Sequence, residues 1–76
     1  MSNPHKFVPF TALESAVIKQ AMDNAERLNK APDWALREKV ENAVSAAVRK
    51  ASFVTVQHNG KVFDFDLLGL ACVSGL

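Results

Sequence analysis

The sequence predicts a small α+β domain, in which an antiparallel helical hairpin is followed by a β-hairpin and a short buried C-terminal segment. Two stretches with apolar residues every three or four positions predict the helices. A later stretch, VTVQHNGKVFDFD, alternates apolar and polar residues around an Asn-Gly pair, which predicts two strands joined by a tight turn. We expect an extended arm at 1–10, the helical hairpin at 11–51, the β-hairpin at 52–67 and an apolar tail at 68–76.

The length and the cysteine content indicate how the domain is stabilised. With 76 residues and one cysteine, the chain forms a single small domain without an internal disulfide. Much of its 49% hydrophobic composition is alanine, which buries little area. Domains of this size usually gain stability from a disulfide, a metal or a second subunit. We therefore expect self-association, most simply as a homodimer.

Charge and hydropathy argue against binding to nucleic acids or membranes. The formal net charge of +1 creates no strong field for either polyanion. The longest apolar stretch, LLGLACVSGL, is about half as long as a membrane-spanning helix. The first residues, MSNPHKFVPF, contain no apolar run of the length found in signal peptides. These features favour a cytoplasmic protein.

The arm at 1–10 contains Pro4 and Pro9, which disfavour helix, together with three large apolar side chains: Phe7, Val8 and Phe10. Apolar residues of this size are rarely left in water. We expect the arm to lie extended against the body of the domain or against a second copy.

The first helix is predicted to begin with a capping box, TALE, in which Thr11 and Glu14 exchange hydrogen bonds between side chain and backbone. One apolar stripe follows, formed by Leu13, Val17, Ile18, Ala21, Met22, Ala25 and Leu28. On the opposite face, two acid–base pairs have the i,i+4 spacing of stabilising ion pairs: Asp23–Arg27 and Glu26–Lys30.

The second helix is expected to have Pro32 as its first residue, with Asp33 near its positive end, and to run to about Lys50. Its apolar stripe consists of Leu36, Val40, Ala43, Val44, Ala47 and Ala51, with Val48 at the edge. The short connection predicts an antiparallel hairpin of helices. Trp34 lies off this stripe. We expect it to cap the end of the helices or to cover the arm, and the alternative is an exposed anchor for a partner.

The Asn59-Gly60 pair tolerates the positive φ of a type I′ turn, which places His58 opposite Lys61 and pairs the strands outward from there. Alternation then assigns one set of residues to the buried face: Val54, Val56, Phe63, Phe65 and Leu67. The opposite face carries Thr55, Gln57, Asp64 and Asp66, with Phe53 and Val62. The register that the turn sets and the register that burial requires agree.

The tail is apolar on every side, so we expect it to be buried by this chain or by another. Asp66 can cap a short helix that runs through Val73, while a third strand over Leu70–Ser74 is the alternative, and we favour the helix. Cys72 lies among apolar residues, which is typical of an inert core thiol.

No motif in the sequence carries catalytic chemistry, and we expect a protein that is not an enzyme and needs no cofactor or metal. Its three glycines form no phosphate-binding pattern. Asp64 and Asp66 lie ~7 Å apart on one strand face, where they can support acid–base chemistry or, with His58, bind a metal. We favour a solvated face that discourages aggregation.

The function that we favour is a protein-binding module, a regulator or inhibitor that acts through its β-hairpin, because free strand edges can accept an added strand. The residues expected to contact the partner are Thr55, Gln57, His58, Asn59, Lys61, Asp64, Asp66 and Trp34. One alternative is a nucleic-acid-binding regulator whose basic residues gather near the hairpin: Arg49, Lys50, His58 and Lys61, with Lys39. A small enzyme or enzyme subunit is the remaining alternative.

Overall fold

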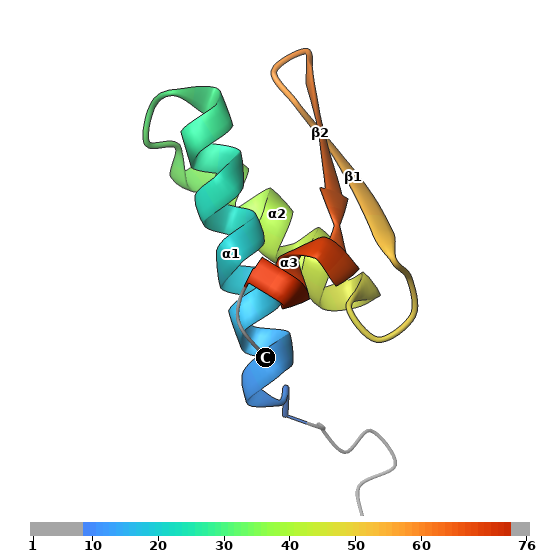
Figure 1. The fold of residues 1–76 in the computed structure, drawn as a ribbon. Helices are drawn as coiled ribbons and strands as arrows, with labels where there is room; N and C mark the ends of the chain where they lie inside the picture. The colour runs from blue at the N-terminus through green and yellow to red at the C-terminus, as the bar shows by residue number, and fades with distance from the viewer. Residues whose placement is uncertain (1–8, 74–76) are drawn as a thin grey trace, which may run out of the picture.

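A computed structural model describes residues 9–73 and shows the α+β architecture that the sequence predicts (Figure 1). The elements are α1 (Ala12–Asn29), α2 (Trp34–Ala47), β1 (Phe53–His58), β2 (Lys61–Asp66) and α3 (Leu67–Val73). The helices α1 and α2 form an antiparallel pair, the β-hairpin stands beside them, and α3 crosses α1 (Figure 1). Most of the predicted arm, 1–8, and the last residues of the tail, 74–76, lie outside the described residues.

The capping box of α1 is confirmed. The backbone N–H of Glu14 donates to the Thr11 hydroxyl at 3.1 Å, and the N–H of Thr11 donates to the Glu14 carboxylate at 2.8 Å. The helix ends where Lys30 adopts a left-handed conformation with φ of 64°. Its N–H then donates to the carbonyls of Glu26 and Arg27, which closes the last turn.

The two ion pairs predicted within α1 do not form. Instead, Arg37 of α2 donates to Asp23 at 3.1 Å and to Glu26 at 2.8 Å. A guanidinium group presents several N–H donors, so Arg37 can bind both carboxylates at once. Arg27 donates to Asn24 instead. Asp23 and Glu26 of α1 therefore join the two helices to each other through Arg37.

The second helix begins at Trp34, so the prediction that Pro32 is its first residue is wrong. Asp33 is the N-cap, and its carboxylate accepts the N–H of Leu36 at 3.1 Å. A capping carboxylate satisfies an N–H that would otherwise have no partner, and this fixes the start of the helix. The helix ends at Ala47, earlier than Lys50, because the N–H groups of Lys50 and Ala51 both turn back to the Ala47 carbonyl.

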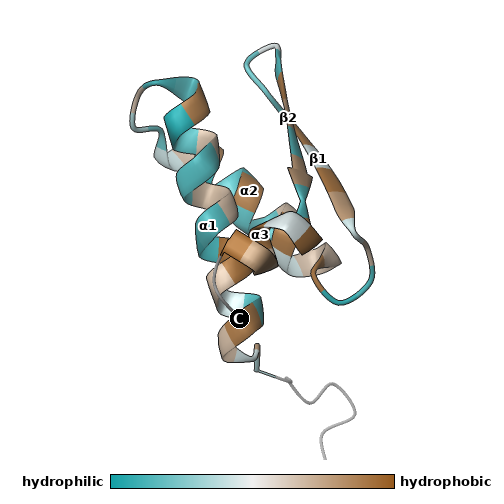
Figure 2. Ribbon diagram, in the orientation of Figure 1, coloured by the Kyte–Doolittle hydropathy of each residue, from teal (hydrophilic) through white to brown (hydrophobic). Residues whose placement is uncertain are grey.

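The core lies where α1, α2, the inner face of the hairpin and α3 meet. Its buried side chains are Val17, Ile18, Ala21, Ala25, Leu36, Val40, Val44, Val56, Phe63, Phe65, Leu67 and Leu70. The ends of the predicted α1 stripe, Leu13 and Leu28, are exposed. Figure 2 shows hydrophobic residues concentrated in α3 and along the strands, and hydrophilic turns on the outward side of α1.

The β-hairpin has the predicted register, with His58 opposite Lys61 and Val54 opposite Phe65. Both turn residues have positive φ, 51° at Asn59 and 78° at Gly60, as a type I′ turn requires. The expected inner face is confirmed: Val56, Phe63, Phe65 and Leu67 are buried, and Val54 is half-buried.

The tail forms the helix that we favoured, and the Asp66 carboxylate accepts the N–H of Leu68 at 3.1 Å. The described part of this chain covers only one face of α3, the face that rests on α1, so burial of the other face by a second chain stays a prediction. Leu67 and Leu70 are buried on the face toward α1. Leu68, Cys72 and Val73 are exposed, since helical periodicity turns them away from it.

The register predicts that substitutions at two adjacent residues of β2, Phe63 and Asp64, have very different effects on stability. We expect Phe63→Ala to reduce the free energy of unfolding by roughly 3–5 kcal/mol, because it leaves a cavity in the core. Asp64→Ala is expected to change it by less than about 0.5 kcal/mol, because this residue faces water. Chemical denaturation of both variants measures the two values, and similar losses would show that the assigned faces are wrong.

Candidate protein-binding surface

The face of the β-hairpin that turns away from the helices is exposed throughout. We call it the outer hairpin face, and it consists of Phe53, Thr55, Gln57, Val62, Asp64 and Asp66. In its middle, the Thr55 hydroxyl donates to the Asp64 carboxylate at 2.9 Å. Phe53 and Val62 lie at opposite ends and are 71% and 56% exposed. Two apolar side chains therefore flank a polar centre in water.

His58, one of the residues expected to contact a partner, is buried and leaves little surface for such a contact. The residue is only 8% exposed, and its Nε2 lies 2.9 Å from the Asp33 carboxylate. Position 58 has the same parity as Val54 and Val56, so alternation turns it toward the helices. The spacing of position 58 from these two inward-facing valines therefore predicts, from sequence alone, that the imidazole is buried. The His58–Asp33 pair fastens the tip of the hairpin to the start of α2.

A histidine beside an aspartate is a common arrangement in acid–base catalysis, so the chemistry of this pair needs to be considered. Asp33 engages Nε2, while Nδ1 is buried and has no hydrogen-bond partner among the described residues. Neither ring nitrogen is therefore presented to a molecule in solution. The geometry supports a structural role for the pair.

The hairpin tip has a second attachment to the helices, because Lys61 donates to the Asn29 side chain at 3.3 Å. Asn59 and Lys61 are exposed, as expected of partner-contacting residues.

Trp34 is 76% exposed. The expectation that it caps the helices is therefore wrong, because none of residues 9–73 buries its side chain. It is the first residue of α2 and lies beside Asp33, which places an exposed aromatic ring at the tip end of the molecule.

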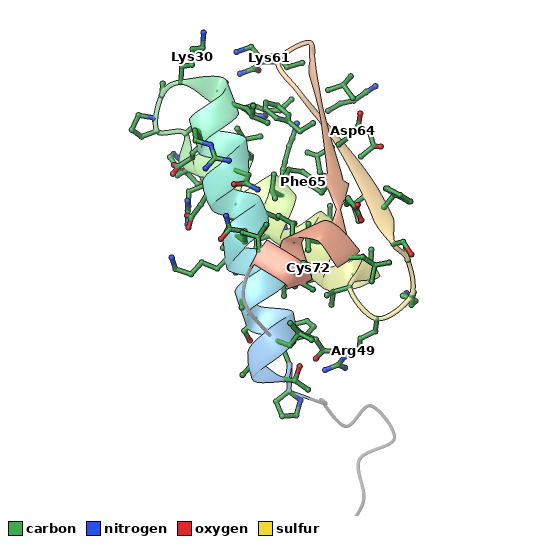
Figure 3. All side chains as sticks on the ribbon, in the orientation of Figure 1. Lys30, Arg49, Lys61, Asp64, Phe65 and Cys72 are labelled. Atoms are coloured by element: carbon green, nitrogen blue, oxygen red, sulfur yellow. The ribbon has the colours of Figure 1, made fainter. Side chains whose placement is uncertain are left out.

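The basic residues considered for nucleic-acid binding do not form one patch. Arg49 pairs with Glu14 at 2.8 Å and lies over the Phe10 ring at 4.9 Å. Lys61 lies at the opposite end of the molecule (Figure 3). Lys39 donates to the Gln57 carbonyl at 3.2 Å beside β1. Arg49 and Lys50 precede the hairpin in the sequence, but the strands carry Lys61 away from Arg49 to the other end of the hairpin (Figure 3).

The structure also separates the residues considered for a metal site. Asp64 and Asp66 lie on the outer hairpin face, whereas His58 lies on the inner one. Within residues 9–73, no three His, Cys, Asp or Glu side chains come close enough to hold a metal ion.

Two further expectations concern Cys72 and membrane spans. Cys72, expected in the core, is exposed. None of the helices within residues 9–73 is long and apolar enough to cross a membrane.

Three carboxylates have lowered pKa values because each accepts hydrogen bonds in its ionised form. Hydrogen bonds from His58 and from the backbone of Leu36 lower the pKa of Asp33. Arg49 and the backbone of Thr11 lower the pKa of Glu14 to about 2, and Arg37 lowers that of Asp23. All three stabilise the contacts between elements when they are charged.

Comparisons with known proteins return no relative: no family model, curated protein or solved structure matches this chain. The function of this chain is therefore inferred from the surface described above. It combines exposed apolar side chains with a hairpin that is held in place at its tip.

The lowered pKa of Asp33 predicts how stability depends on pH. A group whose pKa is lower in the folded state stabilises the fold above its unfolded pKa, and this contribution disappears as the pH falls through the folded value. We therefore expect the free energy of unfolding to decrease as the pH falls below about 4. Asp33→Asn keeps a good N-cap but does not titrate, so its stability deficit relative to the unmodified chain should shrink over this range.

Denaturation at a series of pH values measures this difference. Glu41→Gln is the control, because it removes the same charge from an exposed position of α2. A deficit for Asp33→Asn that stays constant down to a pH of about 2 would contradict the assigned hydrogen bonds.

Proposed function

We propose that this protein is a small non-enzymatic binding module that regulates or inhibits another protein by contacting it with the β-hairpin. The observation that carries the proposal is the exposure of Phe53 and Val62 on the outer hairpin face. Exposed apolar side chains framed by polar groups are typical of surfaces that associate with other proteins. Trp34 adds an exposed indole near the hairpin tip, and tryptophan is enriched among residues that dominate binding energy.

The attachments of the hairpin support the same proposal. The tip is held by His58–Asp33 and Lys61–Asn29, and the edge of β1 by Lys39. A surface fixed before the partner arrives loses less conformational entropy on binding. A two-stranded sheet is marginal by itself, so these contacts also keep the outer face in shape.

The polar centre of the outer hairpin face provides specificity. Asp64 is oriented by the Thr55 hydroxyl, and Gln57 lies opposite Val62. Oriented donors and acceptors favour a partner that satisfies them and penalise one that buries them unpaired.

We propose that the protein resides in the cytoplasm. A free exposed thiol such as that of Cys72 persists there, because the cytosol keeps thiols reduced.

Affinity capture from a native lysate tests the proposal. The tagged chain should retain one stoichiometric partner, and the double variant Phe53→Ser with Val62→Ser should lose it. Both residues lie outside the core, so the variant is expected to fold, which circular dichroism verifies. The control is Ala46→Ser, which replaces an exposed apolar residue of α2 that lies outside the outer hairpin face.

Capture of the same partner by the double variant would contradict the role of the outer hairpin face. Loss of the partner by the Ala46 variant as well would show that the effect is not specific to this face. No partner recovered by the unmodified chain would contradict the proposed function itself.

We also propose that the chain self-associates, because a domain of this size has a limited core. Supporting this proposal, a groove between α1, the segment that follows α2, and α3 has several apolar residues in its lining: Leu13, Val17, Val48, Ala51, Leu67 and Leu68. Sedimentation equilibrium over about a hundredfold dilution should give a mass near twice that of the chain at high concentration. Leu68→Glu should give the single-chain mass, and a single-chain mass for the unmodified protein at every concentration would exclude the dimer.

A further inference from the structure

The register of the hairpin determines which backbone groups point away from the ribbon. In a hairpin closed by two residues, the pair that flanks the turn exchanges backbone hydrogen bonds, and such pairs alternate along the strands. The flanking pair is His58 and Lys61. Thr55 and Gln57 of β1, and Val62 and Asp64 of β2, therefore direct their N–H and C=O groups outward. The hydrogen bond from Lys39 to the Gln57 carbonyl agrees with this alternation.

The two edges have different surroundings. The edge of β1 is contacted by Lys39 of α2 at the Gln57 carbonyl. At the edge of β2, by contrast, no hydrogen bond from residues 9–73 reaches the backbone of Val62 or Asp64. In Figure 1, β2 is the strand on the side of α1. An unpaired strand edge is a template for an additional strand.

A groove runs beside this free edge. It is lined by Asn24, Arg27 and Leu28 of α1, by Asp64 and Phe65 of β2, and by Leu70 of α3. Leu28 is one of the exposed apolar residues of α1, and it gains cover from whatever occupies the groove. A third strand hydrogen-bonded to β2 would lie in this groove and rest its inward side chains on α1 and α3.

We propose that this groove binds an extended, basic segment of the partner protein, which adds to the sheet as a third strand next to β2. The proposal rests on the proposed function and names the chemistry of the partner. Asp64 and Asp66 are exposed carboxylates on the outer side of β2. The outward side chains of an added strand lie within reach of them, so lysine or arginine is favoured there. Its alternate side chains, which face Leu28 and Leu70, are apolar.

The same two carboxylates disfavour a second copy of β2 as the occupant. When two β2 strands pair antiparallel around a twofold axis close to Asp64, this residue comes opposite or diagonal to Asp64 or Asp66 of the other copy. Like charges at these positions destabilise a sheet. Lys61 is the one cation of β2, and it already donates to Asn29.

The test is a titration of the full-length, ¹⁵N-labelled chain with a capped synthetic peptide of about eight residues that alternates lysine and valine. Saturable amide shifts are expected at Val62 and Asp64 of β2 and at Leu28 of α1. A peptide with glutamate in place of lysine should bind at least about tenfold more weakly. Added salt should weaken the binding of the lysine peptide, because the carboxylates of Asp64 and Asp66 are exposed and salt screens their charge.

Two proline variants form a matched pair. Asp64→Pro and Thr55→Pro each remove an outward N–H, and each also removes the hydrogen bond between Thr55 and Asp64. Edge strands tolerate proline at such positions. Asp64→Pro should weaken peptide binding by about tenfold or more, while Thr55→Pro should weaken it by less than about threefold. Asp64→Asn removes only the charge, so its effect should lie between these two.

Four results would overturn the proposal: no saturable binding of the lysine peptide, equal binding of the glutamate peptide, shifts centred on Phe53 or Trp34, or equal effects of the two prolines. The failure of this proposal is distinguishable from that of the proposed function. A captured partner that depends on Phe53 and Val62 but is unaffected by Asp64→Pro would leave the binding module intact and exclude the β2 edge. Peptide binding at β2 without any captured partner would support the edge and contradict the proposed function.

Discussion

The two-residue turn at Asn59 and Gly60 fixes the register of the hairpin, and the remaining contacts of the sheet depend on that register. Side chains on a strand alternate with a period of two, so a shift by one residue would bury Asp64 and expose Phe63. Both strands would change faces together. Because α3 follows β2 without a connecting loop, the register also determines that Leu67 enters the core and that α3 packs on α1.

The same alternation brings a polar group into the interior, which requires a partner for it. His58 is carried to the inner face, and Asp33 supplies the hydrogen bond that a buried imidazole needs. Asp33 also caps α2, so one carboxylate links the start of a helix to the tip of the hairpin. Loss of this side chain affects two elements, since both the first turn of α2 and the imidazole lose a partner.

The features that sequence predicts correctly are those determined by neighbouring residues. The capping box at Thr11, the turn at Gly60 and the faces of the strands each follow from local geometry. Apart from the start of α2, where Asp33 and not Pro32 sets the first turn, the features that differ depend on the opposite element. Arg37 reaches the carboxylates of α1 only because the helices pack together, and Trp34 is exposed because no described element lies over it. For the candidate surface, residue type suggested that His58 is accessible, whereas its parity in the strand indicated burial.

The negative charges of Asp64 and Asp66 affect which strands can pair with β2. Asp64 and Asp66 repel a second copy of the same strand, which limits uncontrolled edge-to-edge pairing. They attract a strand that carries lysine or arginine, because the backbone hydrogen bonds are the same for any sequence and the side chains select among them. Since these carboxylates lie outside the core, their identity can change the choice of partner at little cost to the stability of the fold. Binding specificity and folding thus reside on opposite faces of one ribbon, separated by the alternation of its side chains.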